Sequence, residues 1–456
     1  MFLGKNIRRL NPAEVLVMGF GGMIVIGAIL LCLPVASSTG KSIGFLSALF
    51  SSTSAICVTG LSVIEIGSAL SGFGQVTMLI LIQLGGIGFM TATSLVYMII
   101  GKRITLKDRI VIKDSLNESN LQGVVRMTRN VLLVTVVCEA AGIALLAARF
   151  IPEYGFNTGM YYSVFHSISA FCNAGFDVFG LGTSLQPFIF DPLVNITIML
   201  LIIFGGLGFF VVVELYRKVR RPHKYRLSLH TKIVLIATVA LIAIGFLIFI
   251  LIETHNPKTL GAPNLSFGDK ALASLFQSVT PRTAGYATIP QGDLMPASKI
   301  ITIALMFIGA SPSGTGGGIK TTTALMLLFF VTTVIRGKDD TVIMKRRINK
   351  QLMMRGIAIS TISVLFVAVI TTLIAIFEQG NLTISDVLFE TVSAFGTVGL
   401  STGITASLSP ISQILIMITM FGGRVGLFTV SLALARRMSK QSSVNIRYPE
   451  DKLMIG

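Results

Sequence analysis

Long apolar runs alternate with shorter ones along the whole chain. Runs near the ~20 residues that cross a bilayer as a helix occupy residues 14–36, 75–100, 130–151, 191–215, 231–253, 297–335, 356–378 and 410–435. The sixth run contains a glycine-rich break. Within each pair of runs lies a shorter segment: GFLSALFSSTSAI, MYYSVFHSISAF, DKALASLFQSV and VLFETVSAF. The pattern predicts eight membrane spans and four re-entrant helices that enter and leave on the same side.

The short segments align with one another. They end in SAICVTGL, SAFCNAGF, VTPRTAGY and SAFGTVGL, whose shared glycines, Gly60, Gly175, Gly285 and Gly399, are 115, 110 and 114 residues apart. A phenylalanine assigned to core packing precedes each glycine, and its spacing shows the third copy to be one residue shorter (Phe50, Phe165, Phe276, Phe389). LGGIGF, FGGLGF, TGGGIK and FGGRVG recur in the spans that follow. The chain is therefore read as four copies of span, re-entrant helix, glycine turn and span.

These copies predict the domain organisation and the fold class. Pore repeats are expected at 1–122, 123–226, 227–345 and 346–456, the third with a broken second helix around a loop at 310–318 and the fourth with a cytoplasmic C-terminal tail. The expected fold is an all-α polytopic membrane protein. Its four span–pore-helix–span repeats surround a pseudo-fourfold central pore.

Composition supports this reading. The chain is 53% hydrophobic and 12% charged, against about 25% charged residues in a soluble domain. The first apolar run continues for about 20 residues and is interpreted as a span rather than a signal peptide. The cysteines and histidines have no ligand spacing, so no disulfide framework, metal site or cofactor is expected in this chain.

The net charge of +17 is unevenly placed. Of the 37 Lys and Arg residues, 29 fall in the N-terminus, 102–129, 217–232, 336–355 and the tail from Arg436. Eight spans would put these segments on one face, where they match the positive-inside rule. Both termini are therefore predicted to be cytoplasmic, and a nucleic-acid partner is disfavoured.

The four glycine turns are the candidate site. Non-helical backbone at membrane depth persists only where protein buries it or where it lines an aqueous cavity, and a ring of carbonyls there selects a dehydrated cation. Close helix packing remains the alternative for GGIGF and GGLGF. On the outer face, Glu65, Asp177 and Asp293 are expected to form an electrostatic funnel or to be ordinary solvated carboxylates. The predicted filter residues are Val58, Thr59, Gly60, Asn173, Ala174, Gly175, Thr283, Ala284, Gly285, Thr397, Val398 and Gly399.

The stretch SPSGTGGGIKTTT at 311–323 resembles a phosphate loop only superficially, because Ile319 stands where that motif needs glycine. Pro312 and the glycines instead break the span. The broken segment is interpreted as a gate beneath the third turn, with a static kink as the alternative. Arg424 is expected either to project into the pore or to bond loop carbonyls. Arg282 is expected to brace the third turn, with Glu390 as its candidate partner. The candidate gate residues are Gly314, Thr315, Gly316, Gly317, Gly318, Lys320 and Arg424.

The fourfold plan with VTG, NAG, TAG and TVG turns resembles the potassium-translocating subunits of the Ktr/Trk/HKT superfamily, most closely the KtrB branch, over essentially the whole chain. The resemblance implies potassium uptake through the four turns, which hold K⁺ by backbone oxygens only. Gly60 implies potassium preference, since some plant members with serine there favour sodium. The turns are degenerate beside the TVGYG motif of tetrameric channels.

The resemblance also implies an assembly. It predicts a homodimer in a bacterial cytoplasmic (inner) membrane, gated by a cytoplasmic ring of RCK-type subunits that bind ATP or ADP, with Na⁺ as a candidate activator. An ion-coupled secondary carrier of monovalent cations is the alternative. An enzyme is disfavoured, because no intramembrane carboxylate pair, H-E-x-x-H motif or nucleophile–base constellation is present.

Overall fold

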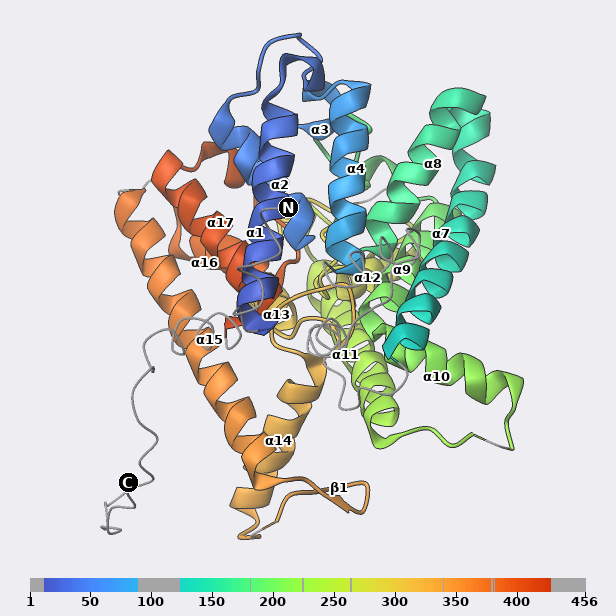
Figure 1. Cartoon of the computed structure of the whole chain (residues 1–456), viewed down its shortest axis with the longest axis vertical. Helices are drawn as coiled ribbons and strands as arrows, with labels where there is room; N and C mark the ends of the chain where they lie inside the picture. The colour runs from blue at the N-terminus through green and yellow to red at the C-terminus, as the bar shows by residue number, and fades with distance from the viewer. Residues whose placement is uncertain are drawn as a thin grey trace, which may run out of the picture.

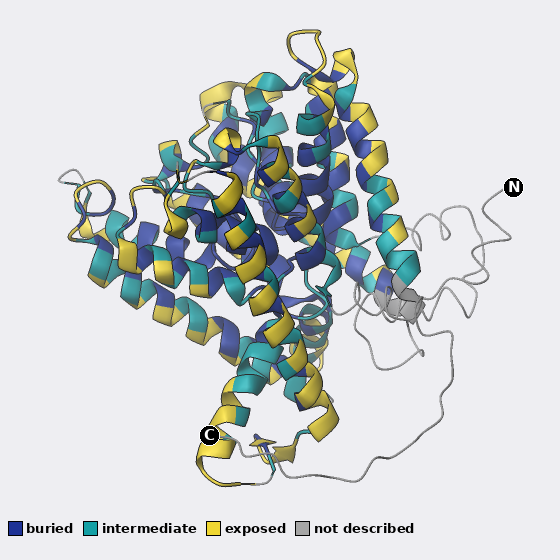
Figure 2. Cartoon of the chain, turned by 90° about the vertical axis from the view of Figure 1, so that its left-hand side faces the viewer, coloured by how far each residue is buried: buried dark blue, intermediate teal, exposed yellow. Residues whose placement is uncertain are grey.

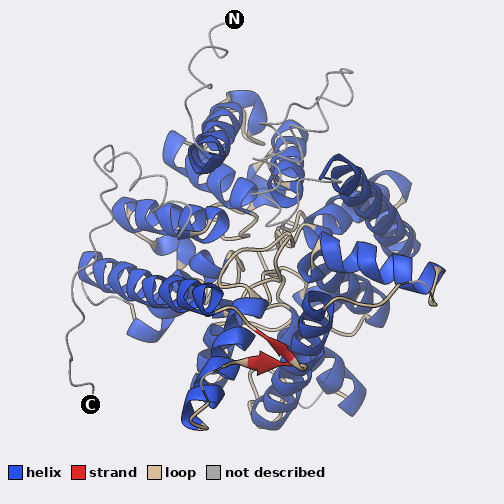
Figure 3. Cartoon of the chain, turned by 60° about the horizontal axis from the view of Figure 1, so that its bottom comes forward, coloured by secondary structure: helices blue, strands red, loops and turns tan. Residues whose placement is uncertain are grey.

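The structure is a computed structural model that describes residues 12–88 and 124–427, apart from residues 181, 224, 263, 264, 339, 379 and 381. Helices provide nearly all of its regular structure (Figure 1). Viewed from below, the helices surround a centre filled by loops (Figure 3). The predicted all-α fold class is confirmed.

The first helix of each repeat is long and unbroken. All four are long and apolar enough to cross a bilayer, yet only 28% of each apolar window is buried within the protein. Apolar side chains such as Ile26, Val136 and Leu365 face outward instead, as expected for contact with lipid. The protein is therefore a multi-pass membrane protein. These helices are α1 (Pro12–Cys32), α7 (Val124–Tyr154), α11 (Leu229–Glu253) and α15 (Lys350–Phe377).

The predicted re-entrant segments are short helices. At 13 to 16 residues they fall short of the roughly 20 residues that a crossing needs. Each packs against the long helix of its own repeat. The phenylalanines assigned to core packing are all completely buried on these helices. The four are α2 (Phe45–Cys57), α8 (Phe156–Phe171), α12 (Phe267–Val279) and α16 (Ile384–Gly396).

The second helix of each repeat stops at the recurring glycine motif. Three of them end at Gly88, Gly208 and Gly426, where φ is 86°, 90° and 89°. Such angles suit glycine and strain other residues. The helix of the third repeat ends just before the loop 310–318. These helices are α4 (Gly72–Ile87), α9 (Pro192–Leu207), α13 (Pro296–Phe307) and α17 (Pro410–Val425).

The prediction of a continuous span at 191–215 is wrong. The chain bends by 102° at Gly208 between α9 and α10 (Phe209–Arg220). The bend occurs because the backbone N–H of Phe209 donates to the carbonyl of Ser313 in the neighbouring loop (3.0 Å). If α9 and α10 count as one span, five of the described helices could cross a membrane by length and composition. The ends of the predicted spans 75–100 and 410–435 lie outside the described residues.

Hydrogen bonds and ion pairs fasten the second helices to the first. Glu253 at the end of α11 accepts from the amide of Met295 (2.9 Å), and Glu378 beside α15 accepts from that of Ser409 (2.9 Å). In the second repeat, Arg149 pairs with Asp191, the N-cap of α9. Proline at the first helical position begins α9, α13 and α17, where a missing N–H removes no helical bond.

The remaining elements are short. A hairpin joins α14 (Thr321–Ile335) to α15, with β1 (Val342–Ile343) antiparallel to β2 (Arg346–Arg347). The other short helices are η2 (Pro34–Ala36), α3 (Ile66–Ala69), η3 (Gln186–Phe188) and η4 (Thr405–Ser407). Buried residues concentrate at the centre of the molecule, around the short helices, while exposed positions follow its outer surface (Figure 2). The core therefore holds the ends of α2, α8, α12 and α16 in place.

Candidate functional site

The four predicted turns adopt one backbone conformation. The first residue of each turn has a positive φ although it is not glycine: 56° at Val58, 59° at Asn173, 69° at Thr283 and 51° at Thr397. Two residues later come the glycines, with φ of 96° at Gly60, 70° at Gly175, 81° at Gly285 and 93° at Gly399. A non-glycine residue at positive φ is uncommon. Its recurrence at four matched positions therefore identifies one local structure built four times.

The turns also touch one another in a closed cycle. A Cβ added to Gly60 would lie within 2.5 Å of the carbonyl oxygen of Ala174 in the next repeat. In the same way Gly175 meets the carbonyl of Ala284, Gly285 meets that of Val398, and Gly399 meets that of Thr59. Each repeat thus packs on the following one and the fourth on the first. The cycle places all four turns around one axis and leaves no room for a side chain at the glycines.

Serine and threonine residues at the ends of the short helices anchor the turns. The carbonyl oxygen of Ser54 accepts a hydrogen bond from the amide of Thr59 (2.8 Å), and the hydroxyl of Ser54 accepts one from the amide of Gly60 (3.1 Å). Ser393 accepts in the same way from Val398 (2.8 Å) and Gly399 (3.1 Å). Ser169 and Thr280 occupy the matching places in the other repeats: the carbonyl of Ser169 accepts from Ala174 (2.8 Å) and that of Thr280 from Ala284 (3.0 Å).

Sequence reasoning missed these anchoring hydroxyls. Their signal lies in the aligned turns, where a hydroxyl residue precedes the glycine by six positions in three repeats and by five in the shortened third.

The turn backbone is left with free oxygen atoms. The eight non-glycine side chains of the turns are completely buried. Within residues 12–88 and 124–427, no described group donates a hydrogen bond to a carbonyl of the twelve predicted filter residues. Carbonyl oxygens without donors, gathered in a ring of turns, are the kind of ligand that can replace the hydration shell of an alkali cation. Each short helix also directs the partial negative charge of its C-terminal end toward the turns.

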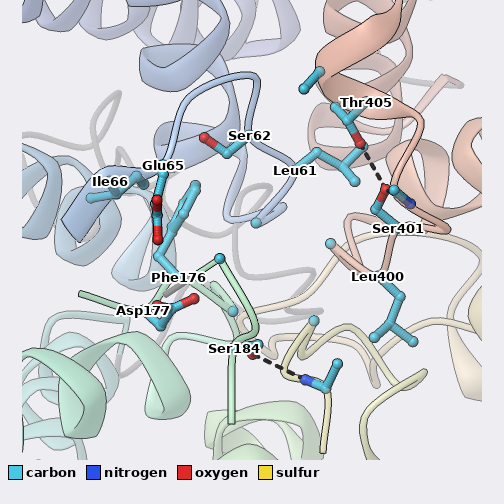
Figure 4. Close-up of a pocket in the computed structure, with 18 of the residues that line it drawn as sticks. Leu61, Ser62, Glu65, Ile66, Phe176, Asp177, Ser184, Leu400, Ser401 and Thr405 are labelled. Carbon is cyan, nitrogen blue, oxygen red and sulfur yellow. Dashed lines mark hydrogen bonds between the residues drawn. The ribbon is translucent and has the colours of Figure 1, made fainter. Parts of the chain in front are cut away.

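All four glycines line one cavity of about 380 Å³. Glu65 and Asp177 are among the other lining residues (Figure 4). Burial raises the pKa of Asp177 to about 6 despite a hydrogen bond from the amide of Phe179, and the nearby Glu65 carboxylate adds to the rise. Asp293 does not line this cavity and lies 3.8 Å from Lys258. Two of the three carboxylates considered for a funnel therefore line the cavity, and their role as a funnel stays a prediction.

The glycine-rich loop lies at the other end of the turns. A Cβ at Gly316 would overlap the side chain of Thr283, and one at Gly317 would overlap Thr397. These threonines begin their turns, whereas the cavity touches the glycines that end them. The loop therefore sits beneath the third and fourth turns, as predicted for the third.

The loop is bonded to the second and fourth repeats. The amides of Ser311 and Thr315 donate to the carbonyls of Gly206 (3.0 Å) and Gly205 (3.2 Å) at the end of α9. The amide of Gly317 donates to the Thr397 hydroxyl (2.8 Å), and that of Gly318 to the carbonyl of Gly423 (3.3 Å) in α17. The segment is thus a bridge across the axis.

Two basic side chains complete the lower end of the site. Arg424 donates to the carbonyls of Thr315 in the loop and Gly85 in α4. Lys320 donates to the carbonyl of Gly316 (2.7 Å). Arg424 thus makes the carbonyl bonds expected of a structural arginine while holding a positive charge next to the loop. Arg424 belongs to the fourth repeat, and its two bonds link that repeat to the loop 310–318 and to the first repeat.

The expected pairing of Arg282 with Glu390 is wrong. Arg282 donates to the hydroxyl of Thr238 on α11 (3.3 Å), and Glu390 accepts from the hydroxyls of Ser401 and Thr405. No ion pair joins Arg282 and Glu390 in the described part of the chain. Arg282 still connects the third turn to the long helix of its repeat.

The fold and this site define a class: membrane proteins in which four pore-type loops of one chain surround a single axis. The chain belongs to the TrkH family of cation transport proteins, whose model matches residues 9–446. The resemblance to KtrB-type subunits is confirmed by relatives along nearly the whole chain.

Two of its relatives are named for the ions that they take up. The Ktr system potassium uptake protein B of Bacillus subtilis is 40% identical over 98% of this chain and 97% of its own. The potassium/sodium uptake protein NtpJ of Enterococcus hirae is 36% identical over 99% of each chain. Among solved structures, the potassium transporter TrkH from Vibrio parahaemolyticus matches with a TM-score of 0.76 and 16% identity, over 96% of this chain and 87% of that one. This structural match supports the fold.

Proposed function

We propose that this protein conducts potassium ions into the cell through the ring of turn carbonyls. The observation that carries the proposal is the closed cycle of contacts among Gly60, Gly175, Gly285 and Gly399. The relative at 40% identity is named as a potassium uptake protein, and the relative at 36% is named for potassium and sodium. The first of these names supports potassium as the transported ion. In this role the twelve predicted filter residues coordinate K⁺ by backbone oxygen only.

Selectivity follows from the backbone of the turns. An ion that enters the ring exchanges water for carbonyl oxygens, and neutral dipoles compensate a monovalent cation without binding it too tightly to leave. The cavity with Glu65 and Asp177 would gather cations before this step. A secondary carrier needs two parts that rock against each other. The cyclic packing of the repeats, together with the loop that bridges α9 and α17, favours a fixed pore.

Gating is assigned to the loop 310–318. In this role the loop lies across the axis, Arg424 brings positive charge beside it, and Lys320 holds it through the Gly316 carbonyl. Both the obstruction and the charge oppose the passage of a cation. Opening then requires the loop to release its bonds to Gly205, Gly206, Thr397 and Gly423, each worth about 1 kcal/mol net.

The proposed setting is a homodimer in the cytoplasmic (inner) membrane of a bacterium, with both termini in the cytoplasm. A cytoplasmic ring of RCK-type subunits that binds ATP or ADP would drive the loop, and Na⁺ would act as an activator. No cofactor in this chain and no enzymatic activity are proposed. The name of the Bacillus subtilis relative, a component of a Ktr system, supports a partner subunit.

Ion flux from proteoliposomes that contain this chain alone tests the proposal. Uptake of ⁸⁶Rb⁺ should be competed by K⁺ and Rb⁺ and much less by Na⁺. Equal competition by the three ions would contradict a carbonyl filter. Absence of flux from folded protein, both alone and after reconstitution with a regulatory partner in a second set of proteoliposomes, would contradict transport.

A further inference from the structure

Helix α10 differs from its neighbours in direction and in charge. It leaves α9 at 102° and runs outward from the bundle at the lower right of Figure 1. Its sequence, FFVVVELYRKVR, is apolar in the first half and basic in the last turn, and Arg221 follows directly. A helix of this composition lying across the spans has the form of a membrane-surface helix.

The depth of α10 is fixed by Glu214. This carboxylate accepts from both the amide and the hydroxyl of Ser228 (2.8 Å each) and from the hydroxyl of Thr231. Ser228 is the N-cap of α11, the point at which the third long span begins. The middle of α10 is therefore held level with the start of this long helix. Because a span begins at the membrane edge, this level would put Arg217, Arg220 and Arg221, which follow Glu214 along the helix, among the lipid headgroups.

The basic C-terminal end of α10 has the features of a lipid-binding surface. Arg217, Lys218, Arg220 and Arg221 form no ion pair with any carboxylate in the described ranges. Beside them Val219 is 81% exposed and Tyr216 is 59% exposed. Arg220 donates to the Tyr216 hydroxyl (3.1 Å) and lies 5.8 Å from the centre of its ring. Exposed apolar and aromatic groups among unpaired charges fit a headgroup boundary better than an acidic protein surface.

The other end of α10 begins at the gate loop. The amide of Phe209, the first residue of the helix, donates to the carbonyl of Ser313 (3.0 Å). Gly208 is packed so closely on Pro312 that an added Cβ would overlap its carbonyl oxygen. A single helix thus connects the loop 310–318 with the membrane surface.

We propose that Arg217, Arg220 and Arg221 bind anionic phospholipid headgroups, and that this contact sets the position of the gate loop through α10. The lipid site stands independently of the proposed function, whereas its effect on gating rests on that function. The two parts therefore need separate measurements.

Lipid retention tests the binding site. The purified chain is exchanged into micelles with rising fractions of phosphatidylglycerol in phosphatidylcholine, and bound lipid is counted by native mass spectrometry. The triple variant R217Q/R220Q/R221Q should lose affinity for phosphatidylglycerol by about fivefold per removed charge, since a basic residue near an anionic surface contributes about 1 kcal/mol. The control K345Q/R346Q, which removes two exposed charges from the β1–β2 hairpin, should bind as the wild type does. Equal retention by the triple variant would overturn the site and leave an acidic partner protein as its occupant.

Flux in liposomes with and without phosphatidylglycerol tests the coupling. Phe209→Pro removes the N–H that reaches Ser313, at a first helical position where proline is tolerated. Gly208 has a ψ of 137°, within the range of ψ taken by a residue before proline. Phe209→Val loses the same ring and keeps the N–H.

Rb⁺ flux through the wild type and Phe209→Val should depend on phosphatidylglycerol, and flux through Phe209→Pro and the triple variant should not. All four chains experience the same accumulation of cations at an anionic bilayer, so that effect cancels. Retained lipid dependence in Phe209→Pro, with a normal size-exclusion profile, would overturn the coupling. Failure of every chain, wild type included, to conduct Rb⁺ would count against the proposed function and leave the lipid-retention result standing.

Discussion

At the scale of single residues, the site is made by glycines and hydroxyls with different tasks. The glycines could be predicted from the sequence because they recur at matched positions after four similar segments, where a chance origin is improbable. The anchoring hydroxyls, such as Ser54 and Ser393, stood in the same alignment, but serine is common at helix ends and its bond to a turn amide becomes visible only in three dimensions. The partner of Arg282 could not be predicted. Thr238 lies 44 residues away on another helix, and no local pattern relates the two.

Gly60→Ser should reduce the preference for potassium over sodium. The new side chain would have to occupy the place of the Ala174 carbonyl oxygen at a φ of 96°, and strain at such a position is roughly 1–3 kcal/mol, enough for about a tenfold loss of selectivity. The flux ratio of the two ions in proteoliposomes measures this. Gly44→Ser is the matched control, because Gly44 also has a positive φ but has open space around it. An unchanged ratio in Gly60→Ser would remove this glycine from the filter.

Ser393→Ala should also weaken selectivity, while Ser393→Thr should preserve it. Alanine leaves the buried amide of Gly399 without its 3.1 Å partner, at a cost of about 1–3 kcal/mol, and the fourth turn loses its anchor. Competition of Rb⁺ uptake by Na⁺ measures the loss. In the control Ser363→Ala, the lost hydroxyl bonds only within its own helix, to the carbonyl of Ile359. Equal effects of the two alanine variants would indicate a general loss of stability instead.

Potassium uptake should fall as pH decreases through about 6. The raised pKa of Asp177 means that its carboxylate is charged above this pH and protonated below it, so acid removes one negative charge from the cavity that precedes the turns. One such charge attracts a nearby cation by about 1 kcal/mol in water, which corresponds to roughly fivefold in uptake at low potassium. Asp177→Asn should abolish this step in the pH profile, and Asp293→Asn, outside the cavity, should keep it. A step retained in Asp177→Asn would assign the titration to another group.

At the scale of elements, the second helices show which breaks in a helix could be predicted from the sequence. The loop at 310–318 was predictable, since Pro312 and its glycines cannot continue a helix. The bend at Gly208 was not, because FGGLGF is equally compatible with a packed helical seam. What decides the bend is the bond from Phe209 to Ser313, a contact between two repeats. Local propensity therefore indicates where these helices can break. Contacts between repeats determine the direction that the chain takes after each break.

Arg424→Ala should increase the leak of Rb⁺ through the chain alone. The substitution removes the bridge between Thr315 and Gly85 together with its positive charge, so both the tether and the barrier beneath the turns are lost. Arg424→Lys retains the charge and separates the two effects, because a leak in the lysine variant as well identifies the tether as the larger one. A fall in expression without any change in leak per molecule would leave Arg424 as a purely structural residue.

At the scale of the whole molecule, four unequal copies make one ring. The copies could be recognised from spacing and composition, and the positive charges predicted their common orientation. The closure of the ring was beyond the sequence, because it depends on the contact of each glycine with a carbonyl of the next repeat. The closed ring accounts for three other features of the structure. These are the turn carbonyls without donors, the cavity that touches all four glycines, and the loop that crosses below the turns.

Anomalous diffraction from Rb⁺-containing crystals tests the ring most directly. The account predicts peaks on the central axis, surrounded by the carbonyl oxygens of the four turns, that weaken when K⁺ replaces Rb⁺. Peaks confined to the acidic cavity, or scattered against the outer helices with the turns devoid of ions, would contradict it.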